Sequence, residues 1–138
     1  MRVVTDTNTA VSGLLWYGAP RQVLDLARAG RIALFTSPVL LAELEDVLLR
    51  EKFFRRVSVV GSTPGDLVWQ YAALVTIIKP AELDPIILDD PDDDAVLACA
   101  ISAHAEVIVS GDRHILSLKG YQNINILSAA EFVIRFLE

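Results

Sequence analysis

The sequence predicts an α/β fold, a three-layer α/β/α sandwich around a central, mostly parallel sheet. Short β-branched segments alternate with longer helical segments along the whole chain, which is the order expected of repeated βα units. The strand segments, such as "VV" at 3–4 and "VIV" at 107–109, are apolar at consecutive positions. Each strand should therefore be covered on both faces, as in a parallel sheet. The chain has 138 residues and no dividing linker, so residues 1–138 are expected to form a single domain.

The first half of the chain begins with two strands, each followed by a helix. Residues 2–6 form a short strand that ends in an acid, and the "DTN" that follows opens into a helix. A further helix over 20–30 begins with a proline and closes on a glycine. Residues 32–36 form the second strand. Ser37 then caps the next helix, with Pro38 at its first position.

The middle of the chain holds a third helix with a clear start signal. Thr63, Pro64 and Asp66 place a capping hydroxyl, a first-turn proline and an acid at the positions that favour helix initiation. This helix is expected to end in the β-branched stretch "VTII" at 75–78.

The last third continues the alternation. A helix follows the run of aspartates, and "EVIVSGD" at 106–112 is a strand with a sharp glycine exit. A short helical segment at 113–118 precedes the final strand at 124–127. Ser128 and Glu131 form a capping box for the C-terminal helix.

The composition of the chain limits the kinds of partner and the location that we expect for it. The mean hydropathy is +0.44 with 53% hydrophobic residues, yet no apolar run approaches the roughly 18 residues of a membrane span. We expect a protein partner for part of this apolar surface, and a homodimer. The N-terminus lacks the features of a signal peptide, so we expect a cytoplasmic protein. The single cysteine, Cys99, lies in an apolar run and is expected to be a buried, inert thiol.

Charge is distributed unevenly along the chain. The net charge of −6 and pI near 4.8 alone argue against a nucleic-acid partner. Residues 1–56, however, carry eight basic residues against six acids, whereas residues 57–138 carry four against twelve. Bound divalent cations would neutralise part of this second excess.

Four acids lie where an α/β fold places its ligands, beyond the carboxyl ends of the strands. Asp6 and Asp112 each follow a strand, and Asp94 begins the helix after the acidic run. Glu43 lies about two turns into the helix that leaves the second strand. Asp6 could alternatively cap a turn, and Asp112 could serve only as a helix N-cap.

The choice of Glu43 is less direct. A helical wheel sets Glu43 and Glu45 on opposite flanks of the apolar stripe, and so does not choose between them. Position along the helix favours Glu43, because it is nearer the sheet edge, whereas Asp46 points farther from the stripe. The stripe consists of Leu40, Leu44, Val47 and Leu48.

The run "LDDPDDD" places five aspartates within six positions, and they cannot all bind one small cation. We expect Asp89 and Asp90 to be exposed and Asp93 to cap the helix. Asp92 either reaches a second ion or is solvated. Asp94 lies beside the small, buried face that includes Ala98 and Ile101, and it is the expected ligand. Substitution of Asp90 should therefore affect metal affinity far less than substitution of Asp94.

A carboxylate cluster at a sheet edge is typical of hard divalent cations. Mg²⁺ and Mn²⁺ take oxygen ligands and bind phosphates through their open positions. Two such ions can activate water and stabilise the leaving oxygen of a phosphodiester. A metal-dependent phosphatase of the haloacid dehalogenase type is disfavoured because Asn8 stands where that enzyme needs a second aspartate. A receiver domain is disfavoured for lack of a paired acid after the first strand.

Four blocks resemble the PIN domain, in the branch described as toxin components of toxin-antitoxin systems. They are "VVTDTNTAVSGLL", "TSPVLLAELEDVL", "DPDDDAVLACAISAHAEVIVSGDRHIL" and "ILSAAEFV", in the family order and over nearly the whole chain. The resemblance implies a Mg²⁺- or Mn²⁺-dependent ribonuclease acting on RNA, with an antitoxin protein as partner. Its metal-binding, catalytic acids carry over to Asp6, Glu43, Asp94 and Asp112, and its supporting polar residues to Asn8, Ser12 and Ser110.

The resemblance leaves two points open. His114 stands where many members have an acid, so a fifth ligand is undecided. A catalytically silent PIN-like module that binds protein is the non-enzymatic alternative, although acids at all four positions argue against it.

Basic and aromatic residues interleave in "REKFFRR" at 50–56. This pattern suits single-stranded RNA, and it equally suits a helix end with core phenylalanines and a solvated rim. The two histidines, His104 and His114, are expected to face solvent. The remaining large aromatic residues are expected in the core or at a subunit interface: Trp16, Tyr17, Trp69 and Tyr71.

Overall fold

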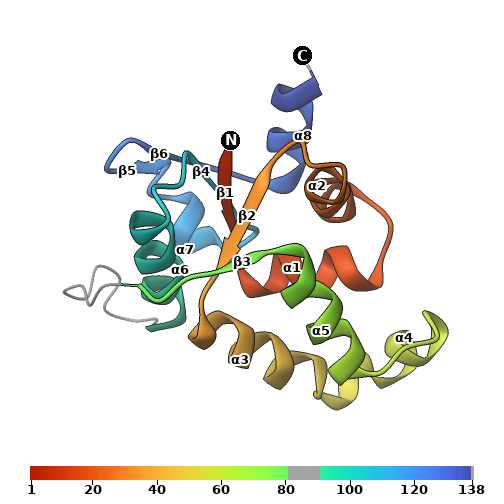
Figure 1. The fold of residues 1–138 in the computed structure, drawn as a ribbon. Coiled ribbons are helices and arrows are strands. Elements are labelled where there is room, and N and C mark those ends of the chain that lie inside the picture. The colour runs from red at the N-terminus through yellow and green to blue at the C-terminus, as the bar shows by residue number, and fades with distance from the viewer. Residues whose placement is uncertain (81–90, 138) are drawn as a thin grey trace.

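The computed structural model describes residues 1–80 and 91–137 and shows the expected three-layer α/β/α sandwich (Figure 1). Within these residues, six strands form one sheet in the order β3-β2-β1-β4-β6-β5. All neighbouring pairs are parallel except β5 and β6, which are antiparallel. The strands are β1 (Arg2–Thr5), β2 (Ala33–Thr36), β3 (Thr76–Ile77), β4 (Val107–Val109), β5 (Gly120–Tyr121) and β6 (Ile124–Leu127).

Helices cover both faces of the sheet. On one face α1, α2 and α8 pack against the strands, with α3 and α5 beside α1, and α6 and α7 cover the other face (Figure 1). The helices are α1 (Thr7–Leu15), α2 (Ala19–Arg28), α3 (Pro38–Leu48), α4 (Phe54–Val59), α5 (Pro64–Leu74), α6 (Pro91–Ser102), α7 (Arg113–Leu116) and α8 (Ala129–Leu137), with a 3₁₀ turn, η1 (Glu51–Phe53), before α4.

The consecutive apolar residues of the strands serve both layers. Val3 of β1 packs into the core beneath α1 and α2, whereas Val4, its neighbour, packs into the core beneath α6. Ile108 of β4 likewise faces α6 while Val107 and Val109 face the other layer. Because successive side chains alternate between faces, only a strand covered on both sides buries such a run. The expectation of a doubly covered sheet is confirmed.

The predicted helix starts are confirmed in detail. Ser37 Oγ accepts a hydrogen bond from Leu40 N, and Thr63 Oγ1 accepts one from Asp66 N. In the capping box, Glu131 N donates to Ser128 Oγ at 3.1 Å and Ser128 N donates to Glu131 Oε1 at 3.2 Å. These bonds lower the pKa of the Glu131 carboxyl, because they favour its charged form.

The start of α6 corrects one prediction. The helix begins at Pro91, so Asp93 lies in its first turn and is not the N-cap that we expected. Proline suits the first helical position because its fixed φ matches the helix. Its lack of an N–H costs nothing there, since an N–H at that position would have no acceptor within the helix. The expectations for Asp89 and Asp90 fall outside the described residues, as does the side chain of Asp92.

Both edges of the sheet contain strands that the periodicity did not indicate. The stretch at 75–78 contains β3, which extends the sheet beside β2 and does not simply end α5. At the opposite edge, β5 and β6 form a hairpin through Gln122 and Asn123, which have φ of 46° and 67°. Two such residues in succession suit a type I′ turn. Each edge strand is only two residues long, which limits the unpaired edge exposed to other chains.

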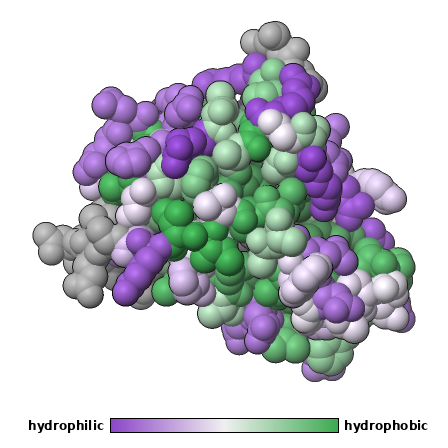
Figure 2. All heavy atoms as spheres, viewed as in Figure 1, coloured by the Kyte–Doolittle hydropathy of each residue, from purple (hydrophilic) through white to green (hydrophobic). Residues whose placement is uncertain are grey.

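Apolar side chains also reach the surface. Figure 2 shows an apolar area near the middle of the view, around β3, where Ile77 is one of the exposed large hydrophobic residues. Tyr71 is buried as expected, whereas Trp16, Tyr17 and Trp69 are exposed. Cys99 is buried, and burial raises the pKa of its thiol to about 12, consistent with an inert role. In the part of the chain that the structure describes, no helix is both long and apolar enough to cross a membrane.

Candidate functional site

Asp6 occupies the junction between β1 and α1. Its backbone N–H donates to Val109 O of the adjacent strand at 3.1 Å, and its side chain caps α1 by accepting a bond from Thr9 N at 2.8 Å. The carboxyl group therefore lies at the carboxyl end of the sheet and at the positive end of a helix. It is only 6% exposed. The expected position at the sheet edge and the alternative role as a cap are both realised.

Ser110 joins the ends of β1 and β4. Its hydroxyl donates to Asp6 Oδ2 at 2.6 Å and accepts from Asp112 N at 3.0 Å. Gly111 N adds a longer bond of 3.3 Å to the same carboxylate oxygen. The serine is fully buried, so this short network lies in a region of low dielectric, where such bonds orient their partners strongly.

Asp112 has two roles in the structure. Its Oδ1 accepts bonds from His114 N at 2.8 Å and Ile115 N at 3.3 Å, so it caps α7. Its backbone is fixed by Ser110, the residue that also holds Asp6. Ser110 thus links the Asp6 carboxylate to the backbone of Asp112 at the carboxyl ends of two neighbouring strands. The His114 side chain is exposed, and its Nδ1 lies 3.9 Å from Asp112 Oδ1.

Glu43 and Asp94 come from two helices that pack against each other, α3 and α6. Glu43 is half-buried whereas Glu45 and Asp46 are exposed, a difference that the helical wheel did not predict. The predicted stripe of α3 is buried at all four positions. Asp94 is half-buried, as are Ala98 and Ile101 on the same side of α6.

The four acids do not form one compact group. Among the described side chains, no three or more His, Cys, Asp or Glu residues lie close enough together to hold a metal ion. The supporting residues also differ in position: Ser110 contacts Asp6 directly, whereas Asn8 is exposed and Ser12 is half-buried, both on α1. The structure therefore places one linked pair, Asp6 and Asp112, and leaves Glu43 and Asp94 as predicted partners.

Comparison with known proteins identifies the family. A family model described as the PIN domain matches residues 2–114. The chain belongs to the PIN-domain family. The matched residues include all four predicted acids. PIN domains are generally nucleases, which makes this chain a hydrolase by family.

Two further proteins are similar to this chain, one in sequence and one in fold. An uncharacterized protein of Methanocaldococcus jannaschii is 28% identical over 120 residues, which cover 86% of this chain and 76% of that protein. The crystal structure of VapBC2 from Rickettsia felis, bound to a DNA fragment from their promoter, has a TM-score of 0.61 and 16% sequence identity. That match covers 91% of this chain and 97% of the other, and it shows a shared fold.

A buried tyrosine supports the site of this PIN domain, a role that the sequence did not indicate. The Tyr71 hydroxyl on α5 lies 2.8 Å from Thr5 Oγ1, on the residue before Asp6. Burial raises the pKa of Tyr71 to about 12, so the hydroxyl stays protonated at neutral pH. The sequence places Tyr71 four residues after Leu67, which indicates only a core position.

We predict that Tyr71→Phe lowers the free energy of unfolding by about 1 to 2 kcal/mol, because Thr5 Oγ1 loses its partner in the core. Urea unfolding of the variant and of the exposed control Tyr17→Phe would measure this. Adding Thr5→Val to Tyr71→Phe should recover part of the loss, since neither polar atom then remains buried alone. A double variant whose loss equals the sum of the two single losses would contradict the direct contact.

Proposed function

We propose that this PIN domain is a Mg²⁺- or Mn²⁺-dependent endoribonuclease and the toxin of a toxin-antitoxin pair. The observation that carries the proposal is the linkage of Asp6 to Asp112 through Ser110 at the carboxyl ends of two parallel strands. Ligand sites of open α/β sheets lie at such edges. Together with membership of a family of nucleases, this favours phosphodiester hydrolysis there.

The chemistry of the donors fits a hard divalent cation. Carboxylate and hydroxyl oxygens are the groups that Mg²⁺ and Mn²⁺ select, and the four proposed ligands are all carboxylates: Asp6, Glu43, Asp94 and Asp112. Thr7, next to Asp6, adds a buried Oγ1 that has no hydrogen-bond partner within the described residues, and a bound water would satisfy it. When bound, the cation supplies an activated water and neutralises charge on the phosphodiester.

The protein side of the site is organised around the Asp6 carboxylate. It accepts three hydrogen bonds, from Thr9 N, Ser110 Oγ and Gly111 N. A carboxylate has about four lone-pair positions, so one remains for a ligand while the other three fix its orientation. Glu43 and Asp94, from the two helices beside the sheet, are proposed to complete the ligand set. Ser110 positions the Asp6 and Asp112 pair without touching the substrate.

Surface composition supports a protein partner. Leu49 and Phe54 are exposed and line the same hollow between the end of α3 and α4, and exposed apolar surfaces favour association. We therefore propose a homodimer and an inhibitory antitoxin as partners. The structural likeness to VapBC2 from Rickettsia felis supports the second of these.

The test is metal-dependent cleavage by the purified chain. We expect single-stranded RNA to be cut internally with Mn²⁺ or Mg²⁺, and cutting to stop when a chelator removes the ion. Single-stranded DNA and p-nitrophenyl phosphate serve as parallel substrates, and faster turnover of the second would indicate a phosphatase instead. A calorimetric titration without Mn²⁺ uptake, together with no RNA cleavage, would favour the catalytically silent binding module.

A further inference from the structure

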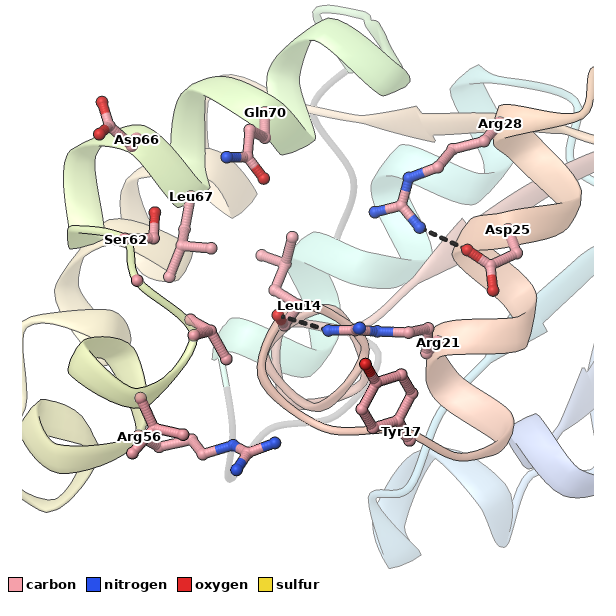
Figure 3. Close-up of a pocket in the computed structure, with 13 residues that line it drawn as sticks. Leu14, Tyr17, Arg21, Asp25, Arg28, Arg56, Ser62, Asp66, Leu67 and Gln70 are labelled. Atoms are coloured by element: carbon pink, nitrogen blue, oxygen red, sulfur yellow. Dashed lines mark hydrogen bonds and ion pairs between the residues drawn. The ribbon is translucent and has the colours of Figure 1, made fainter.

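A polar cavity lies at the far end of α1 from Asp6. Its volume is about 860 Å³, and it is formed by the end of α1 and by α2 on one side and by α4 and α5 on the other (Figure 3). Three arginines line it: Arg21 and Arg28 from α2, and Arg56 from α4. This size falls within the range of roughly 300 to 1,000 Å³ that is usual for ligand sites. The proposed active site uses none of these residues.

The last carbonyl groups of α1 hold two of the arginines in place. Arg21 donates from Nε to Gly13 O and from one Nη to Leu14 O, both at 2.9 Å, and Arg56 donates from Nε to Leu15 O at 2.6 Å. The negative end of the helix dipole explains why two cations gather there. A guanidinium has five N–H donors. Within the described residues, no hydrogen bond occupies the Nη atoms of Arg56 or the second Nη of Arg21, so donors remain for an anion.

Aromatic rings lie directly beside these cations. Tyr17 is 86% exposed, and the Arg21 guanidinium lies 4.8 Å from the centre of its ring. Trp16 is also exposed, with Arg56 at 5.5 Å from its ring centre. Figure 3 shows the Tyr17 ring beside Arg21 at the rim of the cavity. Alternating guanidinium groups and open aromatic faces are the combination that binds single-stranded nucleic acid, through phosphate contact and base stacking.

A stripe on α1 connects this cavity with the site at Asp6. Asn8 and Ser12 are four residues apart and lie on one side of the helix, and Trp16 is the C-cap residue directly after its last turn. The other residues of α1 are buried. From Asp6 to Trp16 the rise along the helix is about 15 Å, which a short stretch of single strand can span.

We propose that this cavity binds the single strand of RNA beyond the cleavage site, with a phosphate at Arg21 and Arg56 and a base against Tyr17. This subsite rests on the proposed function, which places the reacting phosphodiester near Asp6. Two acids, Asp25 and Asp66, also line the cavity. Asp25 is paired with Arg28 at 2.6 Å. The two other arginines then outnumber the one other acid, so the cavity has an excess of positive charge. Open rings that stack bases favour RNA over an acidic peptide.

The first test measures binding without cleavage. Fluorescence anisotropy in the presence of a chelator would give the dissociation constant for single-stranded RNA oligonucleotides of increasing length. We expect Tyr17→Ala to weaken binding at least about fivefold, the loss typical of one stacked base, and only for oligonucleotides long enough to reach the cavity. Trp69→Ala is the matched control, because Trp69 is 74% exposed on α5 but does not line the cavity. Equal losses from both variants, or none from Tyr17→Ala, would overturn the proposal.

The second test reads the phosphate contact from salt dependence. Each phosphate neutralised on a single strand contributes about 0.7 to the slope of log affinity against log salt. Arg56→Gln should reduce the slope by about this amount. Arg55→Gln on the same helix should leave it unchanged, because Arg55 is exposed and does not line the cavity. Unchanged slopes in both variants would contradict a phosphate at Arg56.

The outcomes separate this subsite from the proposed catalysis. RNA binding that depends on Tyr17 and Arg56, without metal-dependent cleavage, would support the subsite and reject the nuclease. Metal-dependent cleavage, with no effect of either variant on RNA binding, would support the nuclease and reject the subsite. A polyglutamate peptide that binds as tightly as RNA and is equally weakened by Tyr17→Ala would overturn the RNA assignment in favour of an acidic protein segment.

Discussion

Asp6→Asn is expected to abolish RNA cleavage while the chain stays folded. The change removes the negative charge of the carboxylate that the network around Ser110 orients, and an amide is a poor ligand for Mg²⁺ or Mn²⁺. Loss of a group that only supports a ligand typically costs 10- to 100-fold, so loss of the ligand itself should lower kcat/KM by more than about a hundredfold. Calorimetry should show a parallel loss of Mn²⁺ affinity.

Stability distinguishes this effect from unfolding. Asparagine is as good an N-cap as aspartate, so the bond from Thr9 N to the side chain of residue 6 should persist. The bonds from Ser110 Oγ and Gly111 N would be weakened, at a cost of about 1 kcal/mol in the free energy of unfolding. The control is Asp46→Asn on α3, where an exposed carboxylate lies 3.4 Å from Arg50 and contributes little. Cleavage by Asp6→Asn at the rate of the unchanged chain would reject the proposed site.

The fold could be predicted from the sequence because its signals are local. Ser37, Thr63 and Ser128 are capping residues followed at the right spacing by their helices, and each makes the expected bond. The doubly apolar strands likewise required cover on both faces. The short edge strands could not be predicted in this way. A segment of two residues, such as 76–77 or 120–121, is too short to show an alternation of apolar and polar residues. These segments form strands because they pair with β2 and β6.

The sequence indicates which residues are candidates for the site, but it does not indicate how they are connected. Asp6 and Asp112 were found because both follow strands, a position readable from the chain. That Ser110 bonds to Asp6 across 104 residues, and Tyr71 to Thr5 across 66, depends on which strands are neighbours. The prediction of Asp93 as the N-cap was wrong. Both aspartate and proline favour a helix start, and the helix begins at Pro91, two residues before Asp93.

Ser110→Ala is expected to lower cleavage by about 10- to 100-fold, because Ser110 positions the proposed ligands without being one. Its hydroxyl is the donor to Asp6 Oδ2 and the acceptor for Asp112 N, so alanine releases both groups at once. The Asp6 carboxylate would keep its bonds from Thr9 N and Gly111 N but lose the shortest of the three. We expect kcat and Mn²⁺ affinity to fall while the KM for RNA changes little, since Ser110 is fully buried.

The same substitution should reduce the free energy of unfolding by about 1 to 3 kcal/mol, because the Asp112 N–H is left without its acceptor. Cleavage must therefore be compared well below the unfolding transition of the variant. The control is Ser117→Ala, whose exposed hydroxyl donates to His114 O at 2.7 Å on the surface of the same region. A variant of Ser110 that loses stability but keeps full kcat and Mn²⁺ affinity would show that the serine only joins two strands, and that the orientation of Asp6 does not depend on it.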